Sequence, residues 1–338
     1  MVRRLIKDGL CRALGSAGLD EWMGRVTRSI HRPWVVGYHL VVEDAAATAE
    51  AMPGLPISAE TLERHLDWIG QHFRFVSLGE LGAIAERGAA PDRSLAAVTF
   101  DDGYRGVYDH AFPMLKRKGI PATVFVVTDL IGTSRLQAHD RLYRLLRRRL
   151  RGPPSEAYRA TRALLQALPL RDVDRLVHSL GEDEGAAGAG LPALLPLTWE
   201  MLSAMQAAGF TIGSHTKTHP VLTRAGPSEV VEEASGSRYA LERRLGACIH
   251  HFAYPDGQFN PAVVRAVAES GYRFAYTTCA HRDPARPSLT LPRTMLWEQS
   301  AIDGAGRFSP AIMSCQAHGL LELVSRCKKD HRASIPRA

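Results

Sequence analysis

Short apolar runs alternate with amphipathic helical stretches along most of the chain, and this alternation restricts the fold more than any other feature. Runs typical of buried strands occur at residues 34–39, 74–78, 95–100, 122–127, 210–213, 249–254 and 274–278. Stretches with helical spacing of apolar residues lie at 58–73, 78–87, 108–118, 200–208, 228–245 and 261–270. Strands that alternate with helices predict an α/β fold with a largely parallel sheet covered by helices.

One long segment, residues 134–196, interrupts this alternation. Its first helical stretch, from residue 139, reads HDRLYRLLRRRLRGPP, and it ends with the loose stretch GEDEGAAGAGLPALLP. The leucines of its first part have helical spacing among many arginines: Leu142, Leu145, Leu146 and Leu150. We interpret the segment as a helical insertion, either a lid or a solvated cationic helix.

The chain therefore divides into three parts. Residues 1–33 form a basic N-terminal segment, residues 34–310 form the main domain with its insertion, and residues 311–338 form a C-terminal tail. The length is enough for one large α/β domain or two modest ones. A core of this size does not need a disulfide or a metal merely to fold.

The N-terminal segment has an amphipathic pattern. Its apolar residues follow a helical period and alternate with basic ones: Val2, Leu5, Ile6, Leu10 and Leu14, with Arg3, Arg4, Lys7 and Arg12. Such a helix either lies on an anionic membrane surface or packs on its own domain. It has no apolar core long enough for a signal peptide, so we expect a cytoplasmic protein, with peripheral contact at the inner membrane face as one hypothesis.

The charge of the chain narrows the possible partners, and its cysteine usage indicates the compartment. The net charge of +7 suits nucleic acid, anionic membranes or phosphorylated substrates, but the chain has no aromatic-and-basic RNA motif, so we expect no nucleic acid partner. The five cysteines are odd in number, irregular in spacing and without a CxxC pair. This usage favours a reducing compartment over a disulfide framework.

Residues typical of catalytic sites follow three of the predicted strands. TFDDGY carries Asp101 and Asp102, SHTKTHP carries His215 and His219, and AYPDG carries Asp256. Because the carboxyl ends of parallel strands meet at the same face of a sheet or barrel, we expect these side chains to be neighbours. The sequence thus predicts one site that three distant segments build together.

Two histidines and an acidic pair together indicate a metal site. HTKTH spaces His215 and His219 so that both would face the same way on a helical turn. Two histidines and one carboxylate form a zinc-binding set with an open position for water. One aspartate would then bind the metal and the other would act as a base, since the cation offsets their mutual repulsion. The alternative is an Asp-rich turn that caps the next helix.

The motifs TFDDGY, SHTKTHPVLT and FAYPDG closely resemble those of the NodB-like polysaccharide deacetylases, carbohydrate esterase family 4. The resemblance covers roughly residues 34–300. It implies a distorted (β/α) barrel with about seven repeats, into which the helical segment 134–196 is inserted. It also implies a metal-dependent hydrolase that removes the acetyl group from an N-acetylated sugar, or occasionally another acyl group.

The resemblance also assigns roles by position. It implies that Asp101 is the general base and that the metal, most often Zn²⁺, is bound by Asp102, His215 and His219. We assign the other motif positions to substrate binding: Tyr104, Tyr254, Pro255 and Asp256.

The third motif departs from the common form of the family. Many members have an arginine two residues before the proline, where it orients the catalytic aspartate, whereas this chain has Ala253. The FAYPxG wording resembles a subgroup linked to exopolysaccharide and lipid-linked sugar biosynthesis. We predict that Arg293, in LPRTM, takes the place of the missing arginine; the alternative is a surface or structural arginine.

The late histidine motif that usually supplies the general acid is not recognisable. The YH motif at the end of the first strand offers His39 instead, and we assign it as the general acid. The alternative is a core or helix-capping histidine.

The predicted activity is the release of acetate from an N-acetylated saccharide. A cytoplasmic location would suit an exopolysaccharide precursor, or a lipid-linked or nucleotide-linked N-acetylhexosamine. Two alternatives stay open: an amidase or deacylase of a small non-polymeric metabolite, and a carbohydrate-binding barrel that has lost catalysis. The intact set of Asp101, Asp102, His215 and His219 argues against the second.

Overall fold

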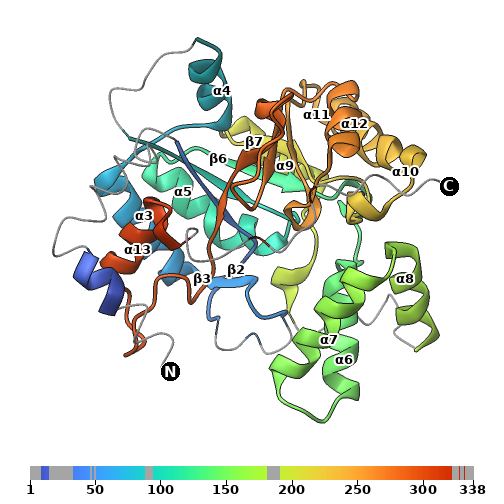
Figure 1. Ribbon diagram of the computed structural model, residues 1–338, viewed down its shortest axis with the longest axis horizontal. Helices are drawn as coiled ribbons and strands as arrows, with labels where there is room; N and C mark the ends of the chain where they lie inside the picture. The colour runs from blue at the N-terminus through green and yellow to red at the C-terminus, as the bar shows by residue number, and fades with distance from the viewer. Residues whose placement is uncertain are drawn as a thin grey trace.

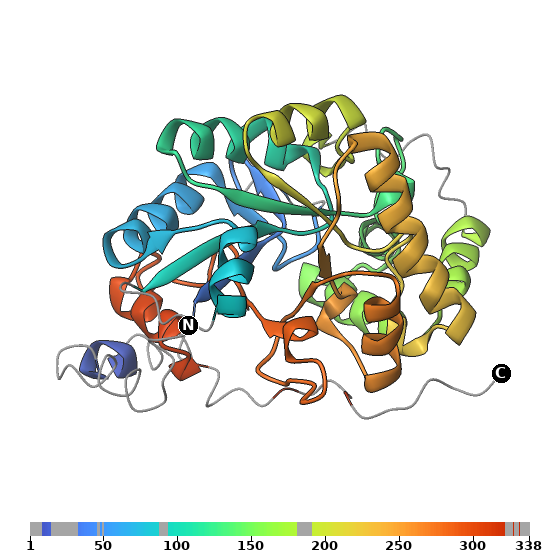
Figure 2. The ribbon, with the colours of Figure 1, turned by 90° about the horizontal axis from the view of Figure 1, so that it is seen from above.

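A curved sheet of parallel strands forms the centre of the computed structural model, and helices cover its outer side (Figures 1 and 2). The structure describes residues 9–14, 33–45, 48, 51–87, 94–180, 191–321, 327 and 331. The strand order is β10-β9-β8-β7-β6-β5-β1-β11, and β4 pairs with β5. The strand bounds are β1 Trp34–Tyr38, β4 Arg74–Phe75, β5 Leu95–Phe100, β6 Ala122–Val126, β7 Thr211–Ser214, β8 His251–Ala253, β9 Phe274–Thr277, β10 Leu291–Pro292 and β11 Thr294–Met295.

Two strands of two residues each, β10 and β11, close the barrel. β10 pairs with β9, with Leu291 opposite Tyr276, and β11 pairs with β1, with Thr294 opposite Val36. Only Arg293 separates β10 from β11, so together they fill one place in the ring. With β1, β5, β6, β7, β8 and β9, this gives seven strand positions around a nearly closed barrel. The predicted (β/α) barrel with about seven repeats is confirmed.

Helices connect the strands, with bounds α3 Ala59–His72, α4 Leu78–Arg87, α5 Phe112–Lys118, α9 Trp199–Ala207, α10 Pro227–Val231, α11 Ser237–Leu245 and α12 Pro261–Glu269. α3 begins where its cap was predicted, because the Ser58 hydroxyl accepts a hydrogen bond from the Thr61 N–H at 3.1 Å. Two predicted helices each contain a π-helical turn, at Val107–Ala111 and Glu232–Gly236. Such turns occur frequently at functional sites.

Alternate residues of the strands fill two separate cores. Val98 and Val124 belong to a large core that includes the inner faces of the helices, whereas Ala97 and Phe125 belong to a smaller cluster that also contains Leu78 and Leu81 of α4. Because side chains alternate along a strand, Thr99 and Asp101 continue the row of Ala97. The polar end of this row lies at the carboxyl end of the barrel.

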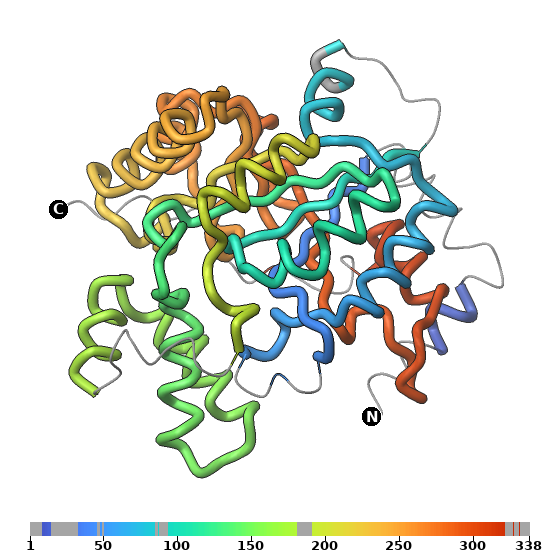
Figure 3. The backbone as a smooth tube through the Cα atoms, turned by 180° about the vertical axis from the view of Figure 1, so that it is seen from behind, coloured from blue at the N-terminus to red at the C-terminus, as the bar shows by residue number. Residues whose placement is uncertain are grey.

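Two predictions for the main domain and the tail differ from the structure. β2 (Leu40–Val42) and β3 (Pro56–Ser58) form a separate parallel pair that the sequence reading left unassigned. α13 (Pro310–Ala317) occupies part of the segment that we assigned to the tail, and it lies beside α3 (Figures 1 and 3). Its Ile312, Met313 and Cys315 are buried. These elements are short and lack a clear apolar period, so the sequence pattern does not predict them, and only their burial in the folded chain identifies them.

The described part of the N-terminal segment packs on the main domain. Residues 9–14 are helical, Cys11 is buried, and Leu14 packs against the large core. Arg12 forms an ion pair with Asp303, with 3.4 Å between Nη2 and Oδ2. The other residues of the predicted amphipathic helix, Val2, Leu5 and Ile6, lie outside the described residues. No helix in the described ranges is long and apolar enough to cross a membrane.

Three helices occupy the predicted insertion: α6 (Ala138–Arg149), α7 (Pro154–Ala167) and α8 (Leu170–Ser179). They project from one side of the barrel as a separate group (Figures 1 and 3). Leu142 and Leu145 of α6 pack against Val173 and Val177 of α8 in a small core of their own. The stretch at residues 181–190 lies outside the described residues.

Buried His65 should make the stability of the protein depend on pH. Its Nδ1 lies 3.4 Å from the Tyr38 hydroxyl, its Nε2 has no partner among the described atoms, and burial lowers its pKa to about 4. The unfolded residue titrates near its ordinary pKa of about 6.5. Between these two values the unfolded chain binds more protons, so stability falls as the pH decreases, by up to about 1.4 kcal/mol per pH unit.

We expect His65→Gln to have a shallower acid slope than the wild type. The measurement is the free energy of unfolding in urea at several pH values between 7 and 4. His178→Gln is the control, because His178 is exposed on α8. Equal slopes in the wild type and His65→Gln would contradict the prediction.

Candidate active site

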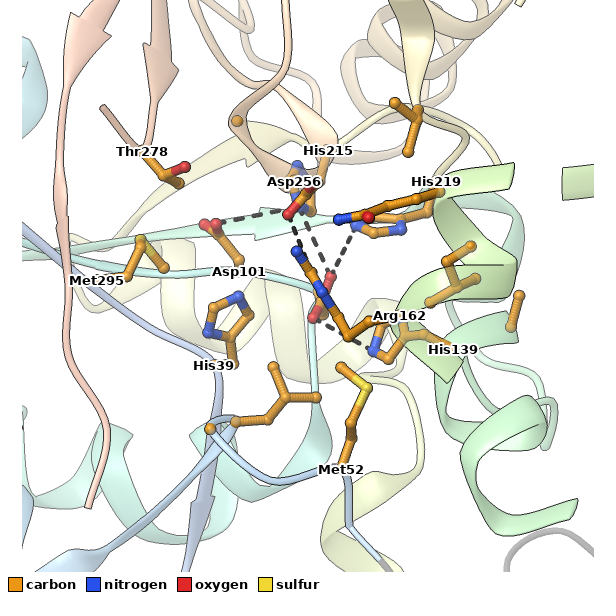
Figure 4. Close-up of a pocket in the computed structure, with 18 of the residues that line it drawn as sticks. His39, Met52, Asp101, His139, Arg162, His215, His219, Asp256, Thr278 and Met295 are labelled. Atoms are coloured by element: carbon orange, nitrogen blue, oxygen red, sulfur yellow. Dashed lines mark hydrogen bonds and ion pairs between the residues drawn. The ribbon is translucent and has the colours of Figure 1, made fainter. Parts of the chain in front are cut away.

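A cavity of about 410 Å³ opens at the carboxyl end of the barrel strands. Asp101 follows β5, His39 follows β1, and His215 follows β7 on the side that faces them (Figure 4). Arg162 of α7 and His139 of α6 approach the same cavity from the insertion. The predicted convergence of strand ends is thus present, and the insertion adds a further wall.

The turn after β5 directs both aspartates into this cavity. Asp102 has a φ of 70° and Gly103 a φ of 68°, so the backbone leaves the extended conformation immediately after Asp101. Adjacent side chains of a straight strand would point to opposite faces. Gly103 also packs closely, because a Cβ at this position would lie 3.0 Å from Cγ1 of Val126. The glycine therefore serves both the turn and the packing beneath it.

Arg293 holds Asp101 with two parallel hydrogen bonds. Its Nη1 donates to Oδ1 of Asp101 at 2.7 Å and its Nη2 donates to Oδ2 at 2.6 Å. Nη1 also donates to the Thr99 hydroxyl at 3.1 Å, and the guanidinium lies 5.1 Å from the ring centre of Phe125. Burial alone would raise the pKa of Asp101, but the charge and hydrogen bonds of Arg293 lower it to about 2. Asp101 is therefore ionised and fixed in orientation.

Asp102, His215 and His219 form a compact set of potential metal ligands. Oδ1 of Asp102 lies 3.6 Å from Nε2 of His215 and 3.3 Å from Nε2 of His219. That carboxylate oxygen is buried and has no hydrogen-bond partner within the described residues. Nδ1 of His215 bonds to the Ala253 carbonyl at 2.8 Å, which leaves the lone pair of Nε2 facing Asp102. The donor set fits a divalent cation.

The electrostatics of the set also fit a cation. Burial, together with the negative charges of Asp101 and Asp140, raises the pKa of Asp102. Burial lowers the pKa of both His215 and His219, so each imidazole is neutral and has a lone pair to offer. A cation among these groups would offset the repulsion of the carboxylates. One carboxylate with two imidazoles is a common zinc-binding set.

The HTKTH motif is a loop, so our prediction of a helical turn was wrong. Thr216 has a φ of 72° and His219 a φ of 69°, which no helix allows. Buried Glu233 anchors the loop, because its carboxylate accepts hydrogen bonds from the N–H groups of Lys217 at 2.8 Å and Thr218 at 2.9 Å. The two histidines therefore meet through a turn that a distant carboxylate stabilises.

His139 and Asp140 belong to the site although the sequence reading did not select them. Nε2 of His139 lies 3.8 Å from Oδ2 of Asp102, and the His139 and His219 rings are 5.5 Å apart. The Tyr104 hydroxyl lies 2.8 Å from Nε2 of His139 and donates to Asp140 at 2.7 Å. Their only sequence signal is the HD pair that opens the insertion, because the fold alone brings α6 to the barrel.

Of the four residues assigned to substrate binding, two border the cavity: Tyr254 and Asp256. Tyr104 is buried behind the ligand set with its hydroxyl already occupied, so it supports His139 and Asp140 instead of facing the cavity. Pro255 is also buried. Asp256 accepts a hydrogen bond from Arg162 at 3.2 Å, which joins the insertion to the loop after β8 across the cavity (Figure 4).

Comparison with known proteins agrees with the motifs. The sequence model for polysaccharide deacetylases matches residues 88–275, more than half of the 338 residues. The chain belongs to the polysaccharide deacetylase family. Its predicted membership is thus confirmed, whereas the FAYPxG subgroup stays a prediction.

Several curated proteins are similar in sequence to part of this chain. The poly-β-1,6-N-acetyl-D-glucosamine N-deacetylase of Staphylococcus epidermidis is 35% identical over 79 residues, which are 23% of this chain and 27% of that protein. The Bacillus subtilis protein YxkH is 21% identical over 239 residues, which are 70% of this chain and 64% of that protein. The chain thus spans less than two thirds of the length of the curated relatives it matches.

Solved structures share the fold. IcaB from Ammonifex degensii has a TM-score of 0.56 and 22% identity, over 85% of this chain and 97% of that one. The Streptococcus pyogenes deacetylase PplD, solved in complex with acetate, has a TM-score of 0.56 and 20% identity, over 83% of this chain and 95% of that one. These similarities agree with the barrel described above.

In this family member, Arg293 reaches the aspartate from the strand pair that closes the barrel. β11 neighbours β1, and β1 neighbours β5, so a side chain from the β10–β11 junction can extend across the interior to Asp101. The Arg293 side chain is fully buried. Burial removes water from both charged groups, and their two parallel hydrogen bonds replace the lost hydration.

We expect Arg293→Met to lower the free energy of unfolding by about 3 kcal/mol or more, because it leaves Asp101 buried without its partner. Asp101→Asn combined with Arg293→Met should recover part of that loss, since neither charge then remains. Urea unfolding of the two single variants and the double variant tests this coupling. Purely additive changes would contradict it.

Proposed function

We propose that this chain is a Zn²⁺-dependent N-deacetylase that releases acetate from N-acetylglucosamine units of a saccharide. The observation that supports this most directly is the Asp101–Arg293 pair beside the set of Asp102, His215 and His219 on the cavity floor. An ionised carboxylate next to a metal site suits hydrolysis, in which a water must lose a proton as it attacks.

The residues divide into a set that holds the cation and a set that moves protons. We assign Asp102, His215 and His219 to the cation, with Zn²⁺ favoured by the imidazoles. When bound, the ion would supply a Lewis acid that lowers the pKa of water and polarises the acetamide carbonyl. We assign Asp101 to accept the proton of the attacking water, because Arg293 keeps it ionised and oriented.

His39 is our candidate for protonating the departing amine. It borders the cavity near Asp101 (Figure 4). Burial lowers its pKa to about 4, although the charge of Asp101 opposes this effect. His39 is thus neutral in the resting site at neutral pH. The proton that it delivers would come from the attacking water: Asp101 accepts this proton and passes it to His39, and His39 gives it to the amine nitrogen as the C–N bond breaks, which leaves Asp101 ionised and His39 neutral again.

The cavity wall is suited to a sugar. Trp297, which is 39% exposed, borders the cavity, and Met52 and Leu55 add apolar surface. Aromatic and apolar side chains with a few polar groups are typical of small-molecule sites. The Staphylococcus epidermidis relative is a poly-β-1,6-N-acetyl-D-glucosamine N-deacetylase, which supports a β-1,6-linked N-acetylglucosamine polymer as the substrate.

We further propose that the sugar is attached to a lipid or nucleotide carrier. A lipid-linked or nucleotide-linked precursor would bring a pyrophosphate, and the net charge of +7 would favour it. The last turn of α6 adds Arg147, Arg148 and Arg149 to the insertion. A peripheral membrane contact would follow if the carrier is a lipid.

A substrate panel with metal-stripped protein tests the proposal. The probes are a β-1,6-linked N-acetylglucosamine oligomer, a chitin oligomer, UDP-N-acetylglucosamine and an N-acetylated amino acid. We expect acetate release from an N-acetylglucosamine substrate only after Zn²⁺ is restored. Release from the amino acid alone would indicate an amidase of small metabolites, and saccharide binding without any release would indicate a barrel that has lost catalysis.

A further inference from the structure

Four potential metal ligands meet outside the active site. They are Cys279 and His281, which follow β9, and Cys327 and His331 of the C-terminal segment. One ligand atom of each lies within 4.8 Å of those of the others. We propose that these four side chains bind a second Zn²⁺ ion, which fastens the C-terminal segment to the barrel. This site does not depend on the function proposed above.

The spacing of the donor atoms matches a tetrahedral zinc site. Nε2 of His331 lies 3.2 Å from Sγ of Cys279 and 3.5 Å from Sγ of Cys327. With Zn–S distances of about 2.3 Å and Zn–N distances of about 2.0–2.1 Å, sulfur and nitrogen ligands of a tetrahedron lie about 3.5 Å apart. The rings of His281 and His331 lie 4.6 Å apart, so His281 can supply the fourth donor.

A neighbouring carbonyl orients His331 for this role. Nδ1 of His331 lies 3.2 Å from the carbonyl oxygen of Phe259, and the two rings are 4.4 Å apart. A backbone carbonyl accepts, so Nδ1 carries the proton and the lone pair of Nε2 faces the two sulfurs. Histidine ligands of metals are commonly held in this way.

The donor types select zinc over other common cations. Two thiolates and two imidazoles form a closed structural zinc set, whereas Mg²⁺ and Ca²⁺ prefer oxygen ligands. The active-site set contains no sulfur. Of the other cysteines, Cys11 and Cys315 are buried and Cys248 is exposed. The two cysteines of this cluster are thus the pair that the fold brings together for a metal.

The ion would brace two loops of the active site. Cys279 directly follows Thr278, which borders the cavity (Figure 4). Phe259, the partner of His331, lies three positions after Asp256 on the neighbouring loop, which follows β8. A Cβ on Gly257 would lie 2.6 Å from the N atom of Thr278, so these loops already pack closely. The second site therefore fixes the backbone that carries one wall of the cavity.

Metal content of the purified full chain gives the first test. The wild type should contain about two zinc ions per chain, and Cys279→Ser with Cys327→Ser should contain about one. Cys248→Ser is the matched control and should keep both ions. His215→Ala with His219→Ala should lose the other ion, so failure of one site can be told apart from failure of the other. An unchanged zinc content in the Cys279→Ser, Cys327→Ser variant would overturn the proposal.

Cobalt substitution of the wild-type chain gives a second test that does not rely on folding of a variant. Only a site with thiolate ligands gives a sulfur-to-cobalt charge-transfer absorption in the near ultraviolet, so we expect this band in the wild type. It should persist in His215→Ala with His219→Ala. A wild-type spectrum without the band, or an intact mass that shows a Cys279–Cys327 disulfide, would refute the second site.

Discussion

Replacing His215 and His219 together with alanine is expected to remove the active-site metal and to lower acetate release by at least about 10³-fold. The double variant leaves Asp102 as the one remaining member of the three-residue ligand set, and one carboxylate does not retain zinc. The expected loss corresponds to several kcal/mol of charge stabilisation in the transition state. Metal content and acetate release, measured on the same preparation, test the prediction.

The single variants and a surface control sharpen this experiment. His219→Ala should bind zinc more weakly and recover part of its activity at high zinc concentration, since Asp102 and His215 remain. His178→Ala, on the exposed face of α8, should match the wild type in both measurements. If the double variant keeps its active-site metal and its rate, the catalytic cation is bound elsewhere and the assigned ligand set is wrong.

The barrel strands could be predicted because each is an apolar run between clear breaks. β1, β5 and β6 begin where the sequence predicts and end within one residue of it, since all three are buried along their full length. β10 and β11 could not be found in this way. Each has two half-buried residues, and pairing with β9 and β1 defines them instead of any pattern of their own.

The site residues show the same difference between those that a local pattern predicts and those that only the folded chain brings together. Asp101, Asp102, His215 and His219 follow predicted strands, so the parallel topology was enough to bring them together. His139 comes from the insertion, whose position on the barrel no local pattern encodes.

Residues that depend on long-range contacts were harder to read from the sequence. HTKTH suggested a helical turn because its spacing permits one, but the carboxylate of Glu233 stabilises a loop there instead. Arg293 could be proposed only because Ala253 left the usual arginine position empty. Its bidentate contact with Asp101 depends on how the barrel closes, and the sequence does not display that closure.

Asp101→Asn is expected to lower kcat by about 10³- to 10⁴-fold while the active-site metal stays bound. The change keeps the shape of the side chain but removes the charge that accepts the proton of the attacking water, and general-base contributions are typically about 10²- to 10⁴-fold. Asp102, His215 and His219 remain, so zinc content should not fall. KM should change little, because the carboxylate acts mainly in the transition state.

Because Asp101 forms two hydrogen bonds with Arg293, the substitution removes a hydrogen bond as well as a charge. Both guanidinium nitrogens donate to Asp101, at 2.7 and 2.6 Å, but an asparagine offers only one acceptor oxygen. Its amide nitrogen would face a second donor, so some loss of stability is expected, and activity should be compared only among folded samples. Asp67→Asn, in the surface pair with Lys118, is the matched control and should keep full activity. A near wild-type rate in Asp101→Asn would assign the proton acceptor to another group, and His39 on the cavity wall is then the candidate.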